Sequence, residues 1–451
     1  MRFLTLLAIL LFWNTLSAKI HINTIWSNSE SGVVDEYSWS NSIVDNNNNV
    51  ITIANKINGS DFDILVKSYD QNGSLNWTYT YDSGNGARDR ALKVLVDNND
   101  NYYVVGSSED LTSGHDVLIF KLSSSGALQW DEFWNGSENR DDLPTDAEIT
   151  SSGDVLVTGI SNHSSPEHLN GASDADIFAL KCLSTGSINW DKELDLDGYD
   201  DISVGCTFDG SYLYVGAHST FSSTINKITI LKIDEIYGGL ETTIQESSVS
   251  KDICSDIIAK NGSVYVIGRT GISKNASIIK YSASLIKQWQ TDINPNNHGA
   301  LCRNLYVSTS GEVYVNIEFT GHSGQGNGRT AKINSDGTVD WNLDFEAYEV
   351  DDVLKAKSLN FNNNKLIAIY DEKNPNSKDK TGAFIIDVSG EVERYIELEN
   401  GAFAETNDID FISNNLVFTT VVEETIGSGR KSIVTLKEYY EFDFTIETDV
   451  N

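Results

Sequence analysis

The sequence repeats itself about every fifty residues, and this internal repeat restricts the possible folds more than any other feature. A short apolar run ending in lysine recurs, followed by a glycine-containing turn and, in most copies, by a tryptophan. The recurring places are Lys67, Lys121, Lys181, Lys232, Lys280, Lys332, Ile385 and Lys437, separated by 54, 60, 51, 48, 52, 53 and 52 residues. A fixed period of this length is typical of solenoids and propellers.

Each copy of the repeat predicts four β-strands. Runs such as residues 102–106 and 264–268 are rich in β-branched and aromatic residues and are bounded by turns of the Asn-Gly or Ser-Gly type. Four antiparallel strands repeated radially form the blade of a propeller. We therefore predict an all-β chain, a single β-propeller over residues 19–451 with eight four-stranded antiparallel blades and seven as the alternative. The expected units are residues 43–92, 93–144, 145–202, 203–253, 254–301, 302–354, 355–408 and 409–451.

The N-terminal region supplies a strand that belongs to the last unit. Trp26 lies 51 residues before Trp77, which lies 53 before Trp130, yet residues 20–28 have no first three strands ahead of them. We expect this segment to complete the last blade and to close the ring, which removes exposed sheet edges. In the rival arrangement, residues 439–451 form that strand.

The order of these motifs resembles the bacterial β-propeller repeat called SBBP. The resemblance rests on the aspartate before strand one, the Tyr-Val-x-Gly run, the Asp-x-x-x-Lys run and the following glycine, and it covers residues 20–440. The tryptophan after the glycine is also similar to that of quinoprotein-like propellers, where it implies docking of one blade on the next. Both resemblances imply a fold and no particular activity.

The N-terminus and the composition suggest the location of the protein and exclude one class of partner. Residues 1–18 combine a basic start, an apolar run and small residues before the expected cleavage after Ala18, as in a secretory signal. We expect a secreted, periplasmic or cell-surface protein, without a transmembrane segment and monomeric. The net charge of −34 argues against nucleic acid as a partner. Cys182, Cys206, Cys254 and Cys302 are expected to be buried thiols, with a disulfide as the alternative.

We predict a ligand-binding face where the loops before strand one and between strands two and three come together. Its residues are Asp89, Asp116, Asp141, Asp174, Asp176, Asp252, Asp351, His163 and His168. Acids enter the third strand in early units, whereas Lys227, Lys274 and Arg329 stand there in later units. This asymmetry suggests a partner-facing side. The competing interpretation is that each aspartate accepts backbone N–H groups in its own turn.

A possible calcium site is expected at Glu193, Asp195, Asp197 and Asp201, where acids alternate before Gly198. The same pattern also fits a half-exposed strand. No other cofactor is indicated. The recurring tryptophans are expected to pack between blades rather than to stack on sugars.

Two functions remain open at the level of the sequence. The first is a secreted, non-enzymatic propeller that binds a protein or a glycan. The alternative is a secreted hydrolase or lyase that acts on polysaccharide through carboxylates at the mouth of the channel. The sequence has no Gly-x-Ser-x-Gly or His-Glu-x-x-His motif. A quinoprotein dehydrogenase is disfavoured because no cofactor-binding set accompanies the tryptophans.

Overall fold

The computed structural model describes residues 24–33, 42–84, 86–110, 114–163, 175–196, 199–222, 225–246, 249–293, 299–320, 327–346, 353–373, 379–401, 403–412, 415–423 and 431–437. The expected signal segment and residues 438–451 lie outside this part of the chain. Within it, the chain forms strands and turns and no helix, so no helix there has the length and apolarity needed to cross a membrane.

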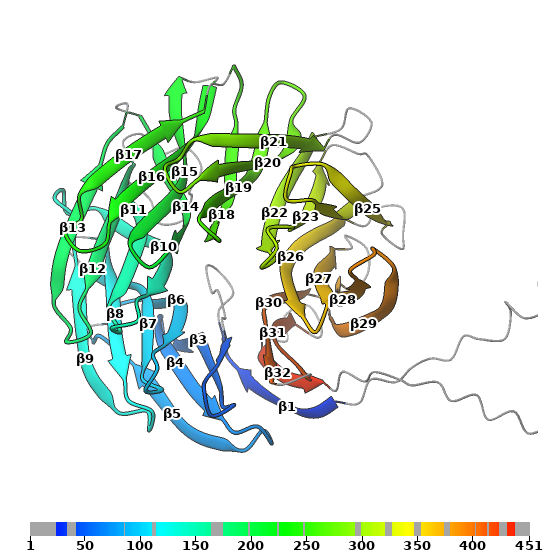
Figure 1. Cartoon of the computed structure of the whole chain (residues 1–451). Helices are drawn as coiled ribbons and strands as arrows, with labels where there is room; N and C mark the ends of the chain where they lie inside the picture. Colours follow the sequence, from blue (N-terminus) through cyan, green and yellow to red (C-terminus); the bar gives the residue numbers. More distant parts are fainter. Residues whose placement is uncertain are drawn as a thin grey trace, which may run out of the picture.

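The strands assemble into eight four-stranded antiparallel sheets (Figure 1). Seven follow the chain order, and the eighth takes its fourth strand from the N-terminal segment. Blades one to four comprise β2 (Ser42–Val44), β3 (Val50–Asn58), β4 (Asp61–Tyr69), β5 (Leu75–Tyr81); β6 (Asp89–Val96), β7 (Tyr102–Asp110), β8 (Gly114–Leu122), β9 (Leu128–Trp134); β10 (Asp141–Ile149), β11 (Val155–His163), β12 (Asp176–Cys182), β13 (Ile188–Leu194); β14 (Asp201–Phe208), β15 (Tyr212–Ser222), β16 (Ile225–Asp234) and β17 (Leu240–Gln245).

Blades five to eight complete the ring. They comprise β18 (Ile253–Lys260), β19 (Ser263–Thr270), β20 (Asn275–Ser282), β21 (Lys287–Ile293); β22 (Gly299–Val307), β23 (Val313–Thr320), β24 (Asn327–Ile333), β25 (Val339–Glu346); β26 (Val353–Asn362), β27 (Lys365–Lys373), β28 (Asp379–Asp387), β29 (Val392–Gly401); and β30 (Phe403–Ile412), β31 (Asn415–Glu423), β32 (Lys431–Lys437) with β1 (Thr24–Ser31). The first strand of each blade is innermost and contacts the first strand of the next, including β30 against β2. The fold is therefore a closed β-propeller, as predicted.

The N-terminal strand closes the ring as expected. β1 pairs with β32 from Thr24 opposite Lys437 to Ser31 opposite Lys431. β1 also holds the first blade: the Glu30 carboxylate lies 2.7 Å from Lys56 Nζ and 2.5 Å from Lys67 Nζ. Ring closure thus joins the two ends of the described chain through a sheet and ion pairs.

The recurring tryptophans dock each blade on the next. Trp77 donates through Nε1 to the carbonyl of Ser124, 3.1 Å away, and its ring lies against Gly126, where an added Cβ would come within 2.5 Å of the indole. The same tryptophan–glycine contact recurs at Trp26–Gly73, Trp130–Gly186, Trp190–Gly238, Trp289–Gly337 and Trp341–Gly390. These tryptophans therefore pack between blades, as expected, rather than forming a ring for stacking on sugars.

The lysine register differs from the prediction in blade one. Lys121, Lys181, Lys280 and Lys332 each lie opposite a tryptophan, but in blade one Ser68 takes that place and Lys67 lies opposite Thr78. Because side chains alternate between the two faces of a strand, this shift by one residue turns Lys67 toward the closing strand. There it pairs with Glu30.

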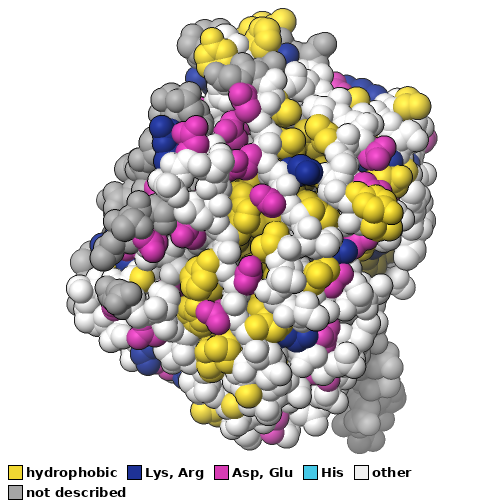
Figure 2. Space-filling view, turned by 90° about the vertical axis from the view of Figure 1, so that its left-hand side faces the viewer, with side chains coloured by type: hydrophobic (Ala, Val, Ile, Leu, Met, Phe, Trp, Pro, Cys, Tyr) yellow, Lys and Arg dark blue, Asp and Glu magenta, His cyan; other side chains and the backbone are white. Residues whose placement is uncertain are grey.

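The cores of the blades lie between neighbouring sheets. One such cluster joins β3, β4, β6, β7 and β8 through Ile53, Val66, Val104 and Phe120, all fully buried. Figure 2 shows the outer side of the ring, where hydrophobic and acidic side chains are interspersed rather than gathered into one patch. All four cysteines are free and buried, which confirms the thiol prediction.

Candidate functional site

The loops that link adjacent blades and the loops between the second and third strands lie on one face of the ring, because strand direction alternates along each blade. We call this the rim face. Three consecutive blade junctions on the rim face share three equivalent places: just before the core of the third strand, just after the fourth strand, and at the start of the next blade. Acids fill all three places at the first and third junctions and two of them at the second.

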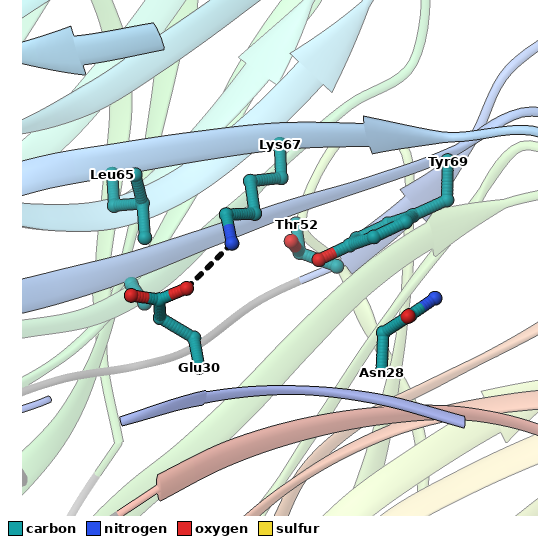
Figure 3. A pocket seen from close by; sticks show the side chains of 7 residues that line it. Asn28, Glu30, Thr52, Leu65, Lys67 and Tyr69 are labelled. Carbon is teal, nitrogen blue, oxygen red and sulfur yellow. Dashed lines mark hydrogen bonds and ion pairs between the residues drawn. The ribbon is translucent and has the colours of Figure 1, made fainter. Parts of the chain in front are cut away.

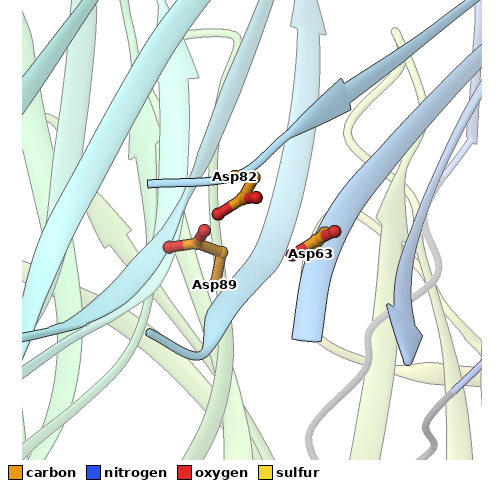
Figure 4. Close-up of side chains that lie close together, drawn as sticks. All are labelled: Asp63, Asp82 and Asp89. Carbon is orange, nitrogen blue, oxygen red and sulfur yellow. The ribbon is translucent and has the colours of Figure 1, made fainter. Parts of the chain in front are cut away.

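The junction between blades one and two brings Asp63, Asp82 and Asp89 together, with one oxygen of each within 4.8 Å of the others. In Figure 4 the carboxylates of Asp82 and Asp89 point toward each other, and Asp63 faces them from β4. Asp89 is fully buried and accepts hydrogen bonds from the Ser83 amide at 2.7 Å and the Ser108 hydroxyl at 2.5 Å. Burial raises the pKa of Asp63 and of Asp89, and the neighbouring acids raise both further.

The junction between blades three and four repeats this arrangement with Asp176, Asp195 and Asp201. Asp201 is fully buried and accepts from the amide of Leu196 at 2.8 Å, just as Asp89 accepts from Ser83. Asn162 donates to Asp176 at 3.0 Å, just as Asn58 donates to Asp63 at 2.9 Å. Burial raises the pKa of Asp201 to about 6, and Asp176 and Asp195 add to the effect.

The junction between them lacks the third carboxylate. Asn135 follows the fourth strand there, and the buried Asp142 accepts from the amides of Gly136 at 2.6 Å and Asn162 at 3.3 Å. Burial raises the pKa of Asp142 to about 7, although these two amides lower it, and Glu193 and Asp116 raise it further.

The structure brings some of the predicted site residues together and separates others. Asp89 accepts from the Ser83 amide in its own turn, as the turn interpretation predicts, whereas Asp141 and Asp252 accept from the amides of His115 and Gly271 on a different loop. Of the predicted calcium ligands, Asp195 and Asp201 meet, whereas Glu193 accepts from the Ser137 amide at the preceding junction. Asp174, Asp197, His168 and Asp351, as well as the side chain of His163, lie outside the described residues.

The second half of the rim face exposes apolar side chains that the sequence analysis did not single out. Tyr199, Phe221, Val249 and Ile272 are 53%, 48%, 74% and 78% exposed. Tyr199 and Val249 lie on loops between blades, Phe221 lies at the end of β15, and Ile272 lies on the loop between β19 and β20. Isolated exposed apolar residues are ordinary, but a contiguous group marks an interaction surface.

Hydrogen bonds connect the segments that carry these residues. The Thr220 amide, next to Phe221, donates to the carbonyl of Asp200, next to Tyr199, at 2.8 Å. The Asn226 amide donates to the carbonyl of Ser250 at 3.1 Å, next to Val249. The Gly271 amide donates to the Asp252 carboxylate at 2.9 Å, next to Ile272. We call Tyr199, Phe221, Val249 and Ile272 the apolar rim.

Lysines accompany the apolar rim on the same loops. Lys227 Nζ lies 4.0 Å from the centroid of the Phe221 ring, and Lys251 and Lys274 are exposed on the two following loops. Lys227 stands at the place that Asp63, Asp116 and Asp176 occupy in earlier blades. The predicted asymmetry of charge across the face is therefore present in the described loops: acidic at the early junctions, and apolar with lysines at the later ones.

A second polar group surrounds the axis of the ring. The first strand of seven blades has a β-bulge, and the residue after it is Lys93, Asp146, Gly205, Asp256, Asn304, Ser358 or Asp408.

Lys93 Nζ pairs with Asp146 at 2.8 Å, and Asp146 also accepts from the Cys206 amide of the next blade. Burial raises the pKa values of Glu148 and Asp256 to about 7, although Lys93 lowers both.

A small pocket lies where the ring closes (Figure 3). Asn28, Glu30, Thr52, Ala54, Leu65, Lys67 and Tyr69 line it, and the Glu30–Lys67 ion pair occupies its centre. Its interior has room for little more than a water molecule. This pocket belongs to the closure of the ring and is too small for a substrate.

Comparisons with known proteins give neither a family nor a function for this chain. No protein-family model matches the chain, and no curated protein has a similar sequence. Solved β-propeller structures are similar. The periplasmic gluconolactonase of Pseudomonas aeruginosa has 13% identity, covering 74% of this chain and 98% of its own, with a TM-score of 0.45.

The WD40 domain of SCAP from fission yeast has 10% identity, covering 92% of this chain and 97% of its own, with a TM-score of 0.47. The polysaccharide lyase Uly1 has 8% identity, covering 89% and 90%, with a TM-score of 0.45. The similar structures thus include enzymes and a WD40 domain and do not separate the two functions. The resemblance to the SBBP repeat stays a prediction.

Proposed function

We propose that the protein is a secreted, non-enzymatic β-propeller that binds a protein partner on its rim face. The observation that carries this proposal is the apolar rim, four exposed apolar residues on neighbouring segments that hydrogen bonds connect. Loops held by a rigid scaffold are common binding sites. Export through the N-terminal signal is part of the proposal.

The charge around the apolar rim indicates the chemistry of the partner. Lys227, Lys251 and Lys274 lie beside it on a chain whose net charge is −34. A segment that combines apolar side chains with aspartate or glutamate would bury the apolar rim and meet these ammonium groups. Charge complementarity of this kind favours the correct orientation and a fast encounter.

A peptide-display selection against the folded protein tests the proposal. We expect the enriched peptides to combine acidic and apolar residues, and to lose binding to the variant Phe221→Ser, Val249→Asn, Ile272→Asn. The matched control is Ile236→Asn, Tyr237→Ser, Ile286→Asn, which removes equally exposed apolar residues from turns on the opposite face. The proposal would be contradicted if the enriched peptides bound both variants equally well. It would also be contradicted if the protein bound only glycans, as tested on a glycan array.

A polysaccharide hydrolase or lyase is the second candidate, favoured by one observation. Glu148 and Asp256, whose pKa values burial raises to about 7, lie near the Lys93–Asp146 ion pair at the axis of the ring. A carboxylic acid that holds its proton near neutral pH beside other carboxylates is a pattern of acid–base catalysis. Release of reducing ends or of unsaturated sugars from a polysaccharide panel, abolished in Glu148→Gln, would establish this candidate and displace the first.

A further inference from the structure

Two of the blade junctions have the geometry of a cation site. At each, one oxygen from each of three aspartates lies within 4.8 Å of the others: Asp63, Asp82 and Asp89 at the first junction, and Asp176, Asp195 and Asp201 at the third. Two oxygens bound to one Ca²⁺ at about 2.4 Å lie at most about 4.8 Å apart. Both groups therefore fit around a single calcium ion.

A buried oxygen at the first junction has no hydrogen-bond partner among the described residues. Asp63 is 93% buried, since its exposure is 7%; its Oδ2 accepts from Asn58, but its Oδ1 is buried without a hydrogen bond. In Figure 4 one oxygen of Asp63 points toward Asp82 and Asp89 and the other points away. Asp201 is fully buried as well, and although burial raises its pKa, a hydrogen bond from the Ser219 hydroxyl lowers it, as Ser108 does for Asp89. An unpaired buried carboxylate oxygen is costly unless a proton or a cation satisfies it.

No basic side chain neutralises the first group. The ion pairs found among the described residues include none to Asp63, Asp82 or Asp89, and the nearby Arg88 lies 3.8 Å from Glu109 instead. Asp61, on the same strand as Asp63, adds a further negative charge. Mutual repulsion among these carboxylates would be relieved by a divalent cation.

The repeat itself supports the assignment, because the same places are filled differently where a cation is not needed. At the second junction Asn135 replaces the third aspartate, and burial raises the pKa of Asp142 to about 7. At the fourth junction Lys227 replaces the first aspartate and supplies its own positive charge. The two complete groups also share the surrounding asparagine and backbone amide.

We propose that the protein binds two Ca²⁺ ions, one at Asp63, Asp82 and Asp89 and one at Asp176, Asp195 and Asp201, each tying one blade to the next. Three carboxylates leave room for backbone carbonyls and water to complete the six to eight oxygens that Ca²⁺ takes. The affinity expected of such an extracellular site is a Kd of about 0.1–1 mM. This proposal does not depend on the partner proposed above.

Calcium titration of the full chain by calorimetry, after removal of metal with a chelator, tests it. We expect two ions per chain at pH 7.5, and a rise in Tm that magnesium does not reproduce. At ten times the Kd, each occupied site shifts the folding equilibrium about 11-fold. Absence of binding by the unaltered chain at millimolar calcium would overturn the proposal without any variant.

Variants then locate the ions. Asp82 and Asp195 are the exposed members of their groups, so Asp82→Asn and Asp195→Asn are expected to fold and to bind one ion each, and the double variant none. The control is Glu138→Gln, an exposed acid on a neighbouring rim loop, which should keep both ions. Asn135→Asp supplies the missing carboxylate and should add a third. Equal loss of calcium in Glu138→Gln and Asp82→Asn would show diffuse attraction to the acidic surface and overturn the assignment.

Discussion

Replacing one turn glycine with alanine tests how the blades hold together. Gly126 lies in the turn between β8 and β9 with a φ of +80°, and a Cβ there would lie 2.5 Å from Cδ2 and 2.6 Å from Cε3 of Trp77. Both atoms belong to a ring that is held by its hydrogen bond to Ser124. Because the Trp77 ring packs directly on this turn, Gly126→Ala should push blades one and two apart locally.

The expected cost has two parts. The left-handed backbone costs alanine about 1–2 kcal/mol, and displacing the packed indole costs about 1–3 kcal/mol. The total is about 2–5 kcal/mol of the free energy of unfolding. Gly262, with a φ of +70° and no atom within 4 Å of its added Cβ, isolates the first part. Gly262→Ala should therefore cost only about 1–2 kcal/mol.

Urea unfolding followed by tryptophan fluorescence measures both variants, since the chain has nine tryptophans and loses none in either. In a Trp77→Ala background the clash is absent, so Gly126→Ala should then cost no more than the control. The coupling energy between the two sites should be about 1–3 kcal/mol. Equal losses at Gly126 and Gly262 would refute the view that the tryptophan–glycine contact docks the blades.

Three further changes have expected outcomes. Glu30→Gln removes the ion pairs that join the closing strand to Lys56 and Lys67, and it should cost about 1 kcal/mol of the free energy of unfolding at pH 7. Burial raises the pKa of Glu30, but the two lysines lower it more, so its pKa lies below the ordinary value. The advantage of the wild type should therefore fade as the pH falls below the ordinary glutamate range, and a difference in urea midpoint that does not change with pH would contradict this. Burial raises the pKa of Glu148 to about 7. Its contribution to the free energy of unfolding should therefore fall by at most about 1.4 kcal/mol per pH unit as the pH rises from about 4.5 to 7. Glu148→Gln should remove this fall from the stability profile measured by thermal unfolding. The four buried cysteines, whose thiol pKa values burial raises, should react with Ellman's reagent only after unfolding, and fewer than four reactive thiols in urea would reveal a disulfide.

The repeat determined the architecture because each copy is one blade. The tryptophan spacing located β1 in the last blade, since the same residue meets the same turn of the following blade at every step. The lysine series was less reliable: Lys67 and Ser68 differ by one residue in sequence but lie on opposite faces of β4. Only the length of the following turn, which sets the register, decides which of them lies opposite Trp77.

The candidate sites were harder to predict because they combine residues from different loops. Asp82 was missed, although it stands where Asp195 stands in the repeat, one residue after the fourth strand. Aligning the blades at the end of that strand would have found it. Asp141 was predicted instead of Asp142. A bulge near the start of β10 determines which of the two is equivalent to Asp89, and the sequence does not show this bulge. The apolar rim gave no sequence signal, since its members are single residues in polar loops.

The pairing of β1 with β32 also determines how the ring would respond to tension. Thr24 lies opposite Lys437, so the chain enters and leaves the last blade at the same end of one antiparallel strand pair. A force applied through the segments on either side would therefore load the hydrogen bonds of that pair one at a time, as in opening a zipper, rather than all together in shear. The ring would open first at this seam, with Glu30 and its two lysines as the next restraint, while the remaining blades, each a continuous stretch of chain, would stay folded.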